Sequence, residues 1–67
     1  MTKRVLITGA AGYVGSLLGS RLAADLHVVG TDIRPRSDLP FAVTAMDVRD
    51  PALADLLRGE GITHVVH

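Results

Sequence analysis

Cysteine and tryptophan are absent from this 67-residue chain, and its only aromatic residues of the Phe, Tyr and Trp type are one phenylalanine and one tyrosine. Without cysteine, the chain can form neither a disulfide nor a zinc–thiolate site, and it has no thiol nucleophile. A chain of this length buries only about 60% of the surface that its unfolded form exposes. The sequence therefore predicts at most one small domain with an aliphatic core.

An excess of either charge is also missing, because seven Lys and Arg residues balance seven Asp and Glu residues. A neutral chain has no general attraction to nucleic acid or to an anionic membrane. No apolar run approaches the roughly 20 residues that span a bilayer. The N-terminus also lacks the apolar core of a signal peptide. We therefore expect a cytoplasmic protein with neither a nucleic-acid partner nor a membrane partner.

Four short apolar segments have the composition of buried strands. The first is Val5-Leu6-Ile7, which ends in Thr8, and the second is residues 27–32. Residues 41–46 and 62–66 are the third and fourth. Continuous β-branched runs without alternation are typical of strands that are covered on both faces of a parallel sheet.

Two helices are predicted between these strands. From about Gly12 to Asp25, apolar residues recur at helical spacing and predict a buried stripe of Val14, Leu17, Leu18, Leu22 and Leu26. The second helix starts after Asp50-Pro51, since Asp suits the N-cap and Pro the first helical position. Either Gly59 or Gly61 ends it.

Residues 34–40, which include Pro35 and Pro40, predict a loop rather than a helix. The second and third strands are thus joined by about nine residues, fewer than the dozen or more that a parallel crossover usually takes. The predicted fold is α/β: a Rossmann-like, doubly wound parallel sheet with four strands in the order 3-2-1-4 and two helices.

Three evenly spaced glycines, Gly9, Gly12 and Gly15, lie where the first strand gives way to the first helix. The free N–H groups and the dipole at a helix N-terminus favour an anion such as a diphosphate. In this interpretation Gly9 permits the turn, Gly12 lets a phosphate approach the backbone, and Gly15 lets the helix pack closely on the strand. A tight strand–helix turn without a ligand is the alternative interpretation.

The spacing Thr8-Gly9-x-x-Gly12-x-x-Gly15 resembles the extended branch of the short-chain dehydrogenase/reductase superfamily, the NAD-dependent epimerase/dehydratase family. Asp32 ends the second strand 17 positions after Gly15, close to the spacing of about 20 expected for an acidic ligand of the adenosine ribose. A carboxylate there repels a 2′-phosphate and favours NAD over NADP. Arg34 and Arg36 stand nearby and could bind such a phosphate.

The resemblance also implies that Asp47 and Val48 line the adenine pocket. The cofactor-binding residues that it implies are Gly9, Gly12, Tyr13, Val14, Gly15, Asp32, Asp47 and Val48. It implies hydride transfer at a carbon–hydroxyl group of a nucleotide sugar or a related small molecule, in a protein that forms a homodimer. Two other functions stay open: a non-catalytic dinucleotide-sensing regulator with the same fold, and a structural fragment that binds no nucleotide.

No residue of this chain is expected to be catalytic. Tyr13 lacks the lysine of the family's Y-x-x-x-K motif, because Leu17 stands in that position, and we expect its side chain to pack beside the glycine turn. His27, His64 and His67 lack metal-ligand spacing, so no metal site is expected. Residues 1–67 are expected to be the N-terminal part of an NAD-binding domain, with the rest of that domain and a substrate domain beyond them.

Overall fold

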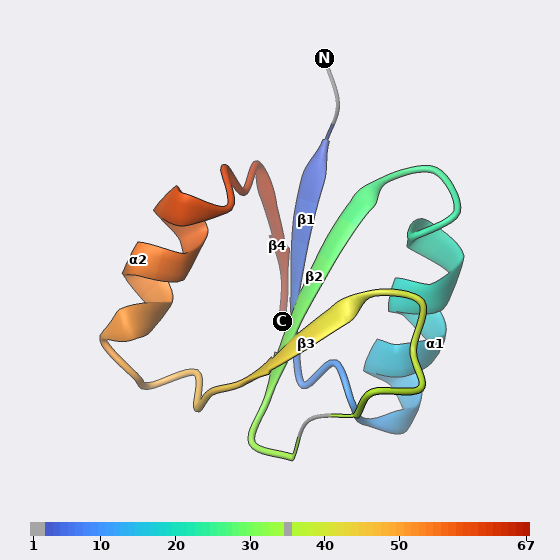
Figure 1. Cartoon of the computed structure of the whole chain (residues 1–67), viewed down its shortest axis with the longest axis horizontal. Coiled ribbons are helices and arrows are strands. Elements are labelled where there is room, and N and C mark those ends of the chain that lie inside the picture. The colour runs from blue at the N-terminus through green and yellow to red at the C-terminus, as the bar shows by residue number, and fades with distance from the viewer. Residues whose placement is uncertain (1–2, 35) are drawn as a thin grey trace.

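The computed structural model describes residues 3–34 and 36–67. Strands and helices alternate along the chain, except that two strands follow each other directly after the first helix (Figure 1). The elements are β1 (Arg4–Thr8), α1 (Tyr13–Leu22), β2 (His27–Asp32), β3 (Ala42–Ala45), α2 (Ala52–Gly59) and β4 (His64–Val66).

The four strands form one parallel sheet in the order β3-β2-β1-β4, which confirms the predicted fold. In this register Ile7 pairs with Gly30 on one side and with Val66 on the other. The connection from β2 to β3 contains no helix or strand in its described residues, as predicted; Pro35 lies outside them. It passes on the same side of the sheet as α1, while α2 lies on the opposite side (Figure 1).

The face of α1 that contacts the sheet differs from the predicted stripe. Three residues of that stripe, Leu18, Leu22 and Leu26, pack against the buried core as predicted. Val14 and Leu17 do not, since they are 72% and 48% exposed. The contacting face is instead rotated toward the glycines of the helix. A Cβ on Gly19 would lie 2.5 Å from the Phe41 ring, closer than side chains tolerate.

The helix faces the sheet with its glycines because α1 and the sheet lie too close together for larger side chains to fit between them. Phe41, which precedes β3, fills the space over both Gly19 and Gly30. A Cβ on Gly30 would lie 2.4 Å from the Cβ of Ala10. The leucine spacing identified a helix, but these small residues decide which side of it faces the core.

Several helices and strands are shorter in the structure than predicted. The first helix ends at Leu22 rather than at about Asp25, and the last strand starts at His64 rather than at Ile62. Helix α2 starts at Ala52 with Pro51 as its N-cap residue, one position later than expected. The Asp50 carboxylate accepts the N–H of Ala52 at 2.9 Å. Gly61, with φ of 62°, makes the left-handed turn that follows that helix.

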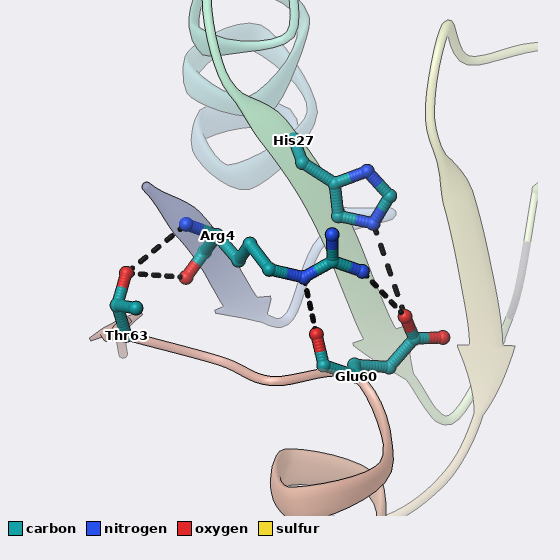
Figure 2. Close-up of polar contacts among 4 residues, drawn as sticks. All are labelled: Arg4, His27, Glu60 and Thr63. Carbon is teal, nitrogen blue, oxygen red and sulfur yellow. Dashed lines mark hydrogen bonds and ion pairs between the residues drawn. The ribbon is translucent and has the colours of Figure 1, made fainter. Parts of the chain in front are cut away.

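A polar cluster ties the end of α2 to the amino ends of the strands (Figure 2). Arg4 donates from Nε to the Glu60 carbonyl, and its Nη2 lies 3.4 Å from the Glu60 carboxylate. His27 Nε2 lies 3.8 Å from the same carboxylate oxygen. The Thr63 hydroxyl bonds to the backbone of Arg4. Since α2 has no fully buried residue, these polar contacts add to the partly buried packing that joins the end of the helix to the sheet.

Candidate functional site

The carboxyl ends of the four parallel strands meet at one edge of the sheet, where the glycine turn follows β1. Gly9 adopts φ of 65°, in the left-handed region that favours glycine, and so permits the sharp turn predicted for it. The Ala10 N–H donates to the Thr31 carbonyl at 3.0 Å, and the Gly12 N–H donates to the Gly9 carbonyl at 3.1 Å. The turn is therefore fixed by the chain itself.

Gly15 is the most tightly constrained of the three glycines of the turn. A Cβ there would lie 2.4 Å from the Gly9 carbonyl oxygen and 3.1 Å from the Ala10 Cα. The close packing predicted for Gly15 is thus packing against the turn that leaves β1. At Gly12 a Cβ would meet only the Gly9 oxygen, at 3.3 Å, which a small adjustment relieves. The chain's own packing requires glycine at position 15 far more than at position 12.

The start of α1 offers free donors to an anion. Within the described part of the chain, no backbone acceptor takes the N–H groups of Tyr13, Val14 or Gly15. Gly12 is the N-cap and provides no side chain to bond them, and the first turn contains no acidic residue. Unpaired N–H groups and the positive end of the helix dipole therefore face whatever binds here.

Asp32, at the end of β2, connects the sheet to this turn. Its Oδ2 accepts the Ala11 N–H at 3.0 Å, and its Oδ1 accepts the Arg34 N–H at 3.0 Å. These bonds, led by that of Arg34, hold the pKa of the Asp32 carboxyl below its usual value against the opposing effect of burial. The carboxylate thus stays ionised beside the glycine turn, and each oxygen keeps a lone pair for a further donor.

The two arginines after Asp32 differ in their surroundings. Arg36 is paired with Asp38 through two bonds, of 2.9 Å and 2.6 Å, and its Nη1 lies 3.4 Å from the Ala11 carbonyl. Within residues 3–34 and 36–67, the Arg34 side chain has no carboxylate within ion-pair distance. Both arginines line a shallow groove with Asp32, Ala11 and Gly12.

An open groove of about 310 Å³ runs along the strand ends from Gly9 toward β3, and we call it the β3-side groove. Asp32, Asp47 and Val48 line it together with Gly9, so four predicted site residues share one cleft. Its remaining lining residues are Thr8, Thr31, Ile33, Met46 and His67. None of these five was predicted from the sequence. Ile33, directly after Asp32, is 73% exposed although it is apolar.

Asp47 is held by its neighbour Arg49. The guanidinium reaches the two carboxylate oxygens at 3.2 Å and 2.9 Å, and the Arg49 N–H also donates at 2.9 Å. This arrangement lowers the pKa of Asp47 to about 2, so the carboxylate is ionised at any physiological pH. It can accept a hydrogen bond from a ligand amine in the β3-side groove.

A second groove of similar size lies on the other side of the glycine turn, between α1 and β4. This β4-side groove is lined by Ile7, Thr8, Gly9, Gly12, Val14, Gly15, Leu18, Val66 and His67. The two grooves share Thr8, Gly9 and His67, so the free N–H groups at the start of α1 lie close to the β3-side groove. The two grooves and the glycine turn form a continuous surface that fits an elongated ligand with an anionic centre.

Tyr13 is the predicted site residue whose side chain lies away from the two grooves. Tyr13 does not pack beside the turn as expected, because as the first residue of α1 it projects into solvent and is 84% exposed. Over residues 3–34 and 36–67, no three His, Cys, Asp or Glu side chains come together as metal ligands. In the same residues, no helix combines the length and apolarity that crossing a membrane requires.

The chain was compared with protein families, curated proteins and solved structures. The model of the NAD dependent epimerase/dehydratase family matches residues 5–67, which is nearly the whole chain. Neither the curated proteins nor the solved structures give a significant match.

Proposed function

The chain belongs to the NAD-dependent epimerase/dehydratase family, and we propose that it forms the NAD-binding part of such an enzyme. One observation carries the proposal: the glycine turn, Asp32 and the Asp47-Val48 pair surround adjoining grooves at the carboxyl edge of a parallel sheet. In open α/β sheets, ligands bind at this edge beside the point where the strand order reverses. Here that point lies between β1 and β4.

The residues present fit a dinucleotide. The N–H groups of Tyr13, Val14 and Gly15 would hold the diphosphate bridge, which approaches over Gly12. Asp32 would accept hydrogen bonds from the adenosine ribose hydroxyls through its remaining lone pairs. Asp47 and Val48 would receive the adenine, with the carboxylate toward its amino group and the valine against the ring.

We propose NAD rather than NADP as the cofactor. An ionised Asp32 repels a 2′-phosphate, and the groove next to it offers little compensation because Arg36 is already paired with Asp38. Arg34 is the one nearby cation without a carboxylate partner among residues 3–34 and 36–67. A single exposed arginine is weaker than the repulsion of a carboxylate next to the ribose.

The proposed reaction is hydride transfer at a carbon–hydroxyl group of a nucleotide sugar or related small molecule. A bound nicotinamide dinucleotide supplies the hydride acceptor or donor. This chain would contribute the binding and orientation of that cofactor, and it would exclude water from the strand edge. The proton-transfer residues of the family's Y-x-x-x-K motif are not within these 67 residues.

Calorimetric titration of the protein with NAD, NADH and NADP tests the proposal. We expect saturable binding of NAD and NADH with a 1:1 stoichiometry, and weaker binding of NADP. Gly12→Val should abolish this binding, because its side chain would occupy the phosphate approach, while the far-UV circular dichroism stays close to native. No saturable binding by the wild-type protein, or an unchanged NAD affinity in Gly12→Val, would refute the assignment.

Asp32→Ala tests the choice of cofactor. Loss of the carboxylate should move the ratio of NADP to NAD affinity toward NADP, even if both affinities decrease. Asp25→Ala is the matched control, since Asp25 is an exposed acid in the turn after α1, at the end of the helix away from the glycine turn. A ratio that stays constant in Asp32→Ala would exclude Asp32 as the ribose ligand.

A further inference from the structure

His67, the residue after β4, joins the two grooves. Its Nδ1 lies 2.8 Å from the Thr8 hydroxyl oxygen, so the ring is hydrogen-bonded to the last residue of β1. Thr8 and His67 line both grooves, as Gly9 does. An imidazole is thus fixed beside the glycine turn, where the ligand would pass from one groove to the other.

The hydrogen bond to Thr8 leaves the other ring nitrogen, Nε2, for a ligand. Within the described residues, no hydrogen bond or ion pair occupies it. When the Thr8 hydroxyl donates to Nδ1, the neutral ring carries its proton on Nε2 and can donate from there. A protonated ring donates from Nε2 as well. The Thr8 hydroxyl has one proton, and its oxygen also lies 3.4 Å from the Val66 carbonyl oxygen. Donation to the nearer Nδ1, at 2.8 Å, makes Nε2 of the neutral ring a donor that suits a phosphate oxygen.

We propose that His67 is a direct ligand of the diphosphate bridge of the bound dinucleotide, and that Thr8 is the positioning residue that orients its ring. This inference rests on the proposed function. The diphosphate is the favoured part of the ligand because His67 shares the β4-side groove with Gly12, Val14 and Gly15. Asp32 and Asp47, by contrast, face the β3-side groove as acceptors and suit hydroxyl and amino groups.

ADP and adenosine separate the phosphate contacts from the nucleoside contacts. His67→Ala should weaken the binding of ADP and NAD by about tenfold, the effect of losing one charge-assisted hydrogen bond. It should leave the adenosine affinity unchanged. His67→Gln keeps an N–H donor and should bind ADP more tightly than His67→Ala does. Thermal unfolding of each variant shows how much the change affects the fold.

The chain provides a matched control on the same strand. His64 also accepts or donates a 2.8 Å hydrogen bond through Nδ1 to a threonine, Thr63, but at the amino end of β4. It lines neither groove. His64→Ala removes an equivalent imidazole–threonine pair and should leave ADP and NAD affinities within twofold of wild type.

A double-mutant cycle tests the role of Thr8. Thr8→Val alone should weaken ADP binding by a few-fold, and in the His67→Ala background it should have no further effect. Additive losses would refute the positioning role. A His67→Ala protein that has a lower melting temperature but wild-type ADP and NAD affinities would overturn the proposal and leave a purely structural role. Absence of NAD binding in the wild type is a different result, which would refute the proposed function as well.

Discussion

Gly15→Ala adds one methyl group at the point of closest approach between α1 and the glycine turn. The new Cβ would lie 2.4 Å from the Gly9 carbonyl oxygen, whereas ordinary contacts of this kind lie at 3.4 Å or more. The oxygen belongs to the backbone of a turn with left-handed geometry, so it cannot swing aside as a side chain would. The start of α1 must therefore shift by about 1 Å relative to the turn.

Two opposing effects set the change in stability. Crowding of a packed contact costs about 1–3 kcal/mol, and replacing a helical glycine by alanine returns about 1 kcal/mol. The free energy of unfolding should therefore decrease by about 0–2 kcal/mol. The effect on binding is larger in relative terms, because the shift displaces the N–H groups of Tyr13 and Val14 from the Gly9 turn. Loss of one hydrogen bond to a charged group, worth about 1.5–3 kcal/mol, weakens affinity by roughly tenfold to a hundredfold.

Gly12→Ala is the matched control, with the same methyl group three residues earlier. Its Cβ would lie 3.3 Å from the same oxygen, so only a few tenths of an ångström must be accommodated. Urea denaturation and NADH titration of both variants compare the two positions. We expect Gly15→Ala to lose stability and affinity together, and Gly12→Ala to lose affinity with little change in stability. A Gly15→Ala protein that is more stable than wild type and binds NADH equally well would refute the reasoning.

Three further predictions concern other parts of the molecule. In a carbon-detected NMR titration, the Asp47 carboxyl should titrate with a pKa of about 2, and Arg49→Gln should return this pKa toward 3.8. Because the pKa is lower in the folded than in the unfolded chain, the contribution of Asp47 to stability is complete above about pH 4 and is lost as the pH falls toward 2. Thr31→Val should raise the free energy of unfolding by about 1 kcal/mol in urea denaturation, because the Thr31 hydroxyl is buried and has no hydrogen-bond partner within the described residues; a destabilised variant would contradict this. Glu60→Gln should lower the free energy of unfolding by less than about 1 kcal/mol, since its partners Arg4 and His27 are partly exposed, and 1 M salt should remove the difference; a larger loss that persists in salt would exclude a screened surface interaction.

The strands could be predicted because local composition determines them, whereas their order was predicted from the doubly wound topology that goes with alternating strands and helices. Val5, Leu6 and Ile7 are all buried, as a continuous apolar run in a parallel sheet requires. The Asp50-Pro51 pair marks the start of α2 for equally local reasons. The face of α1 could not be predicted in this way. It depends on Phe41, which comes from a distant loop and occupies the space left by Gly19 and Gly30.

The residues that the structure brings together at the candidate site were predictable where they carry charge or lack a side chain. Asp32, Asp47 and the glycines stand at strand ends, and parallel strands bring those ends together. The apolar and hydroxyl-bearing lining of the β3-side groove was not predictable, since Ile33 and Met46 differ in no local feature from residues that face elsewhere. His67 was also missed, because its relation to Thr8 spans 59 positions of sequence.

The hydrogen bonds of the glycine turn divide its donors into two sets. The N–H groups of Ala10, Ala11 and Gly12 bond to the Thr31 carbonyl, the Asp32 carboxylate and the Gly9 carbonyl. The next three N–H groups, at the start of α1, have no acceptor within the described backbone. The first set builds the turn before any ligand arrives, which reduces the entropic cost of binding. Asp32 has two roles here, since its carboxylate accepts a hydrogen bond from the turn and also lines the β3-side groove. If the proposed diphosphate site is correct, a substitution of Asp32 that changes cofactor preference should also loosen this site, whereas a substitution of Arg34 or Arg36 leaves the Ala11–Asp32 bond intact.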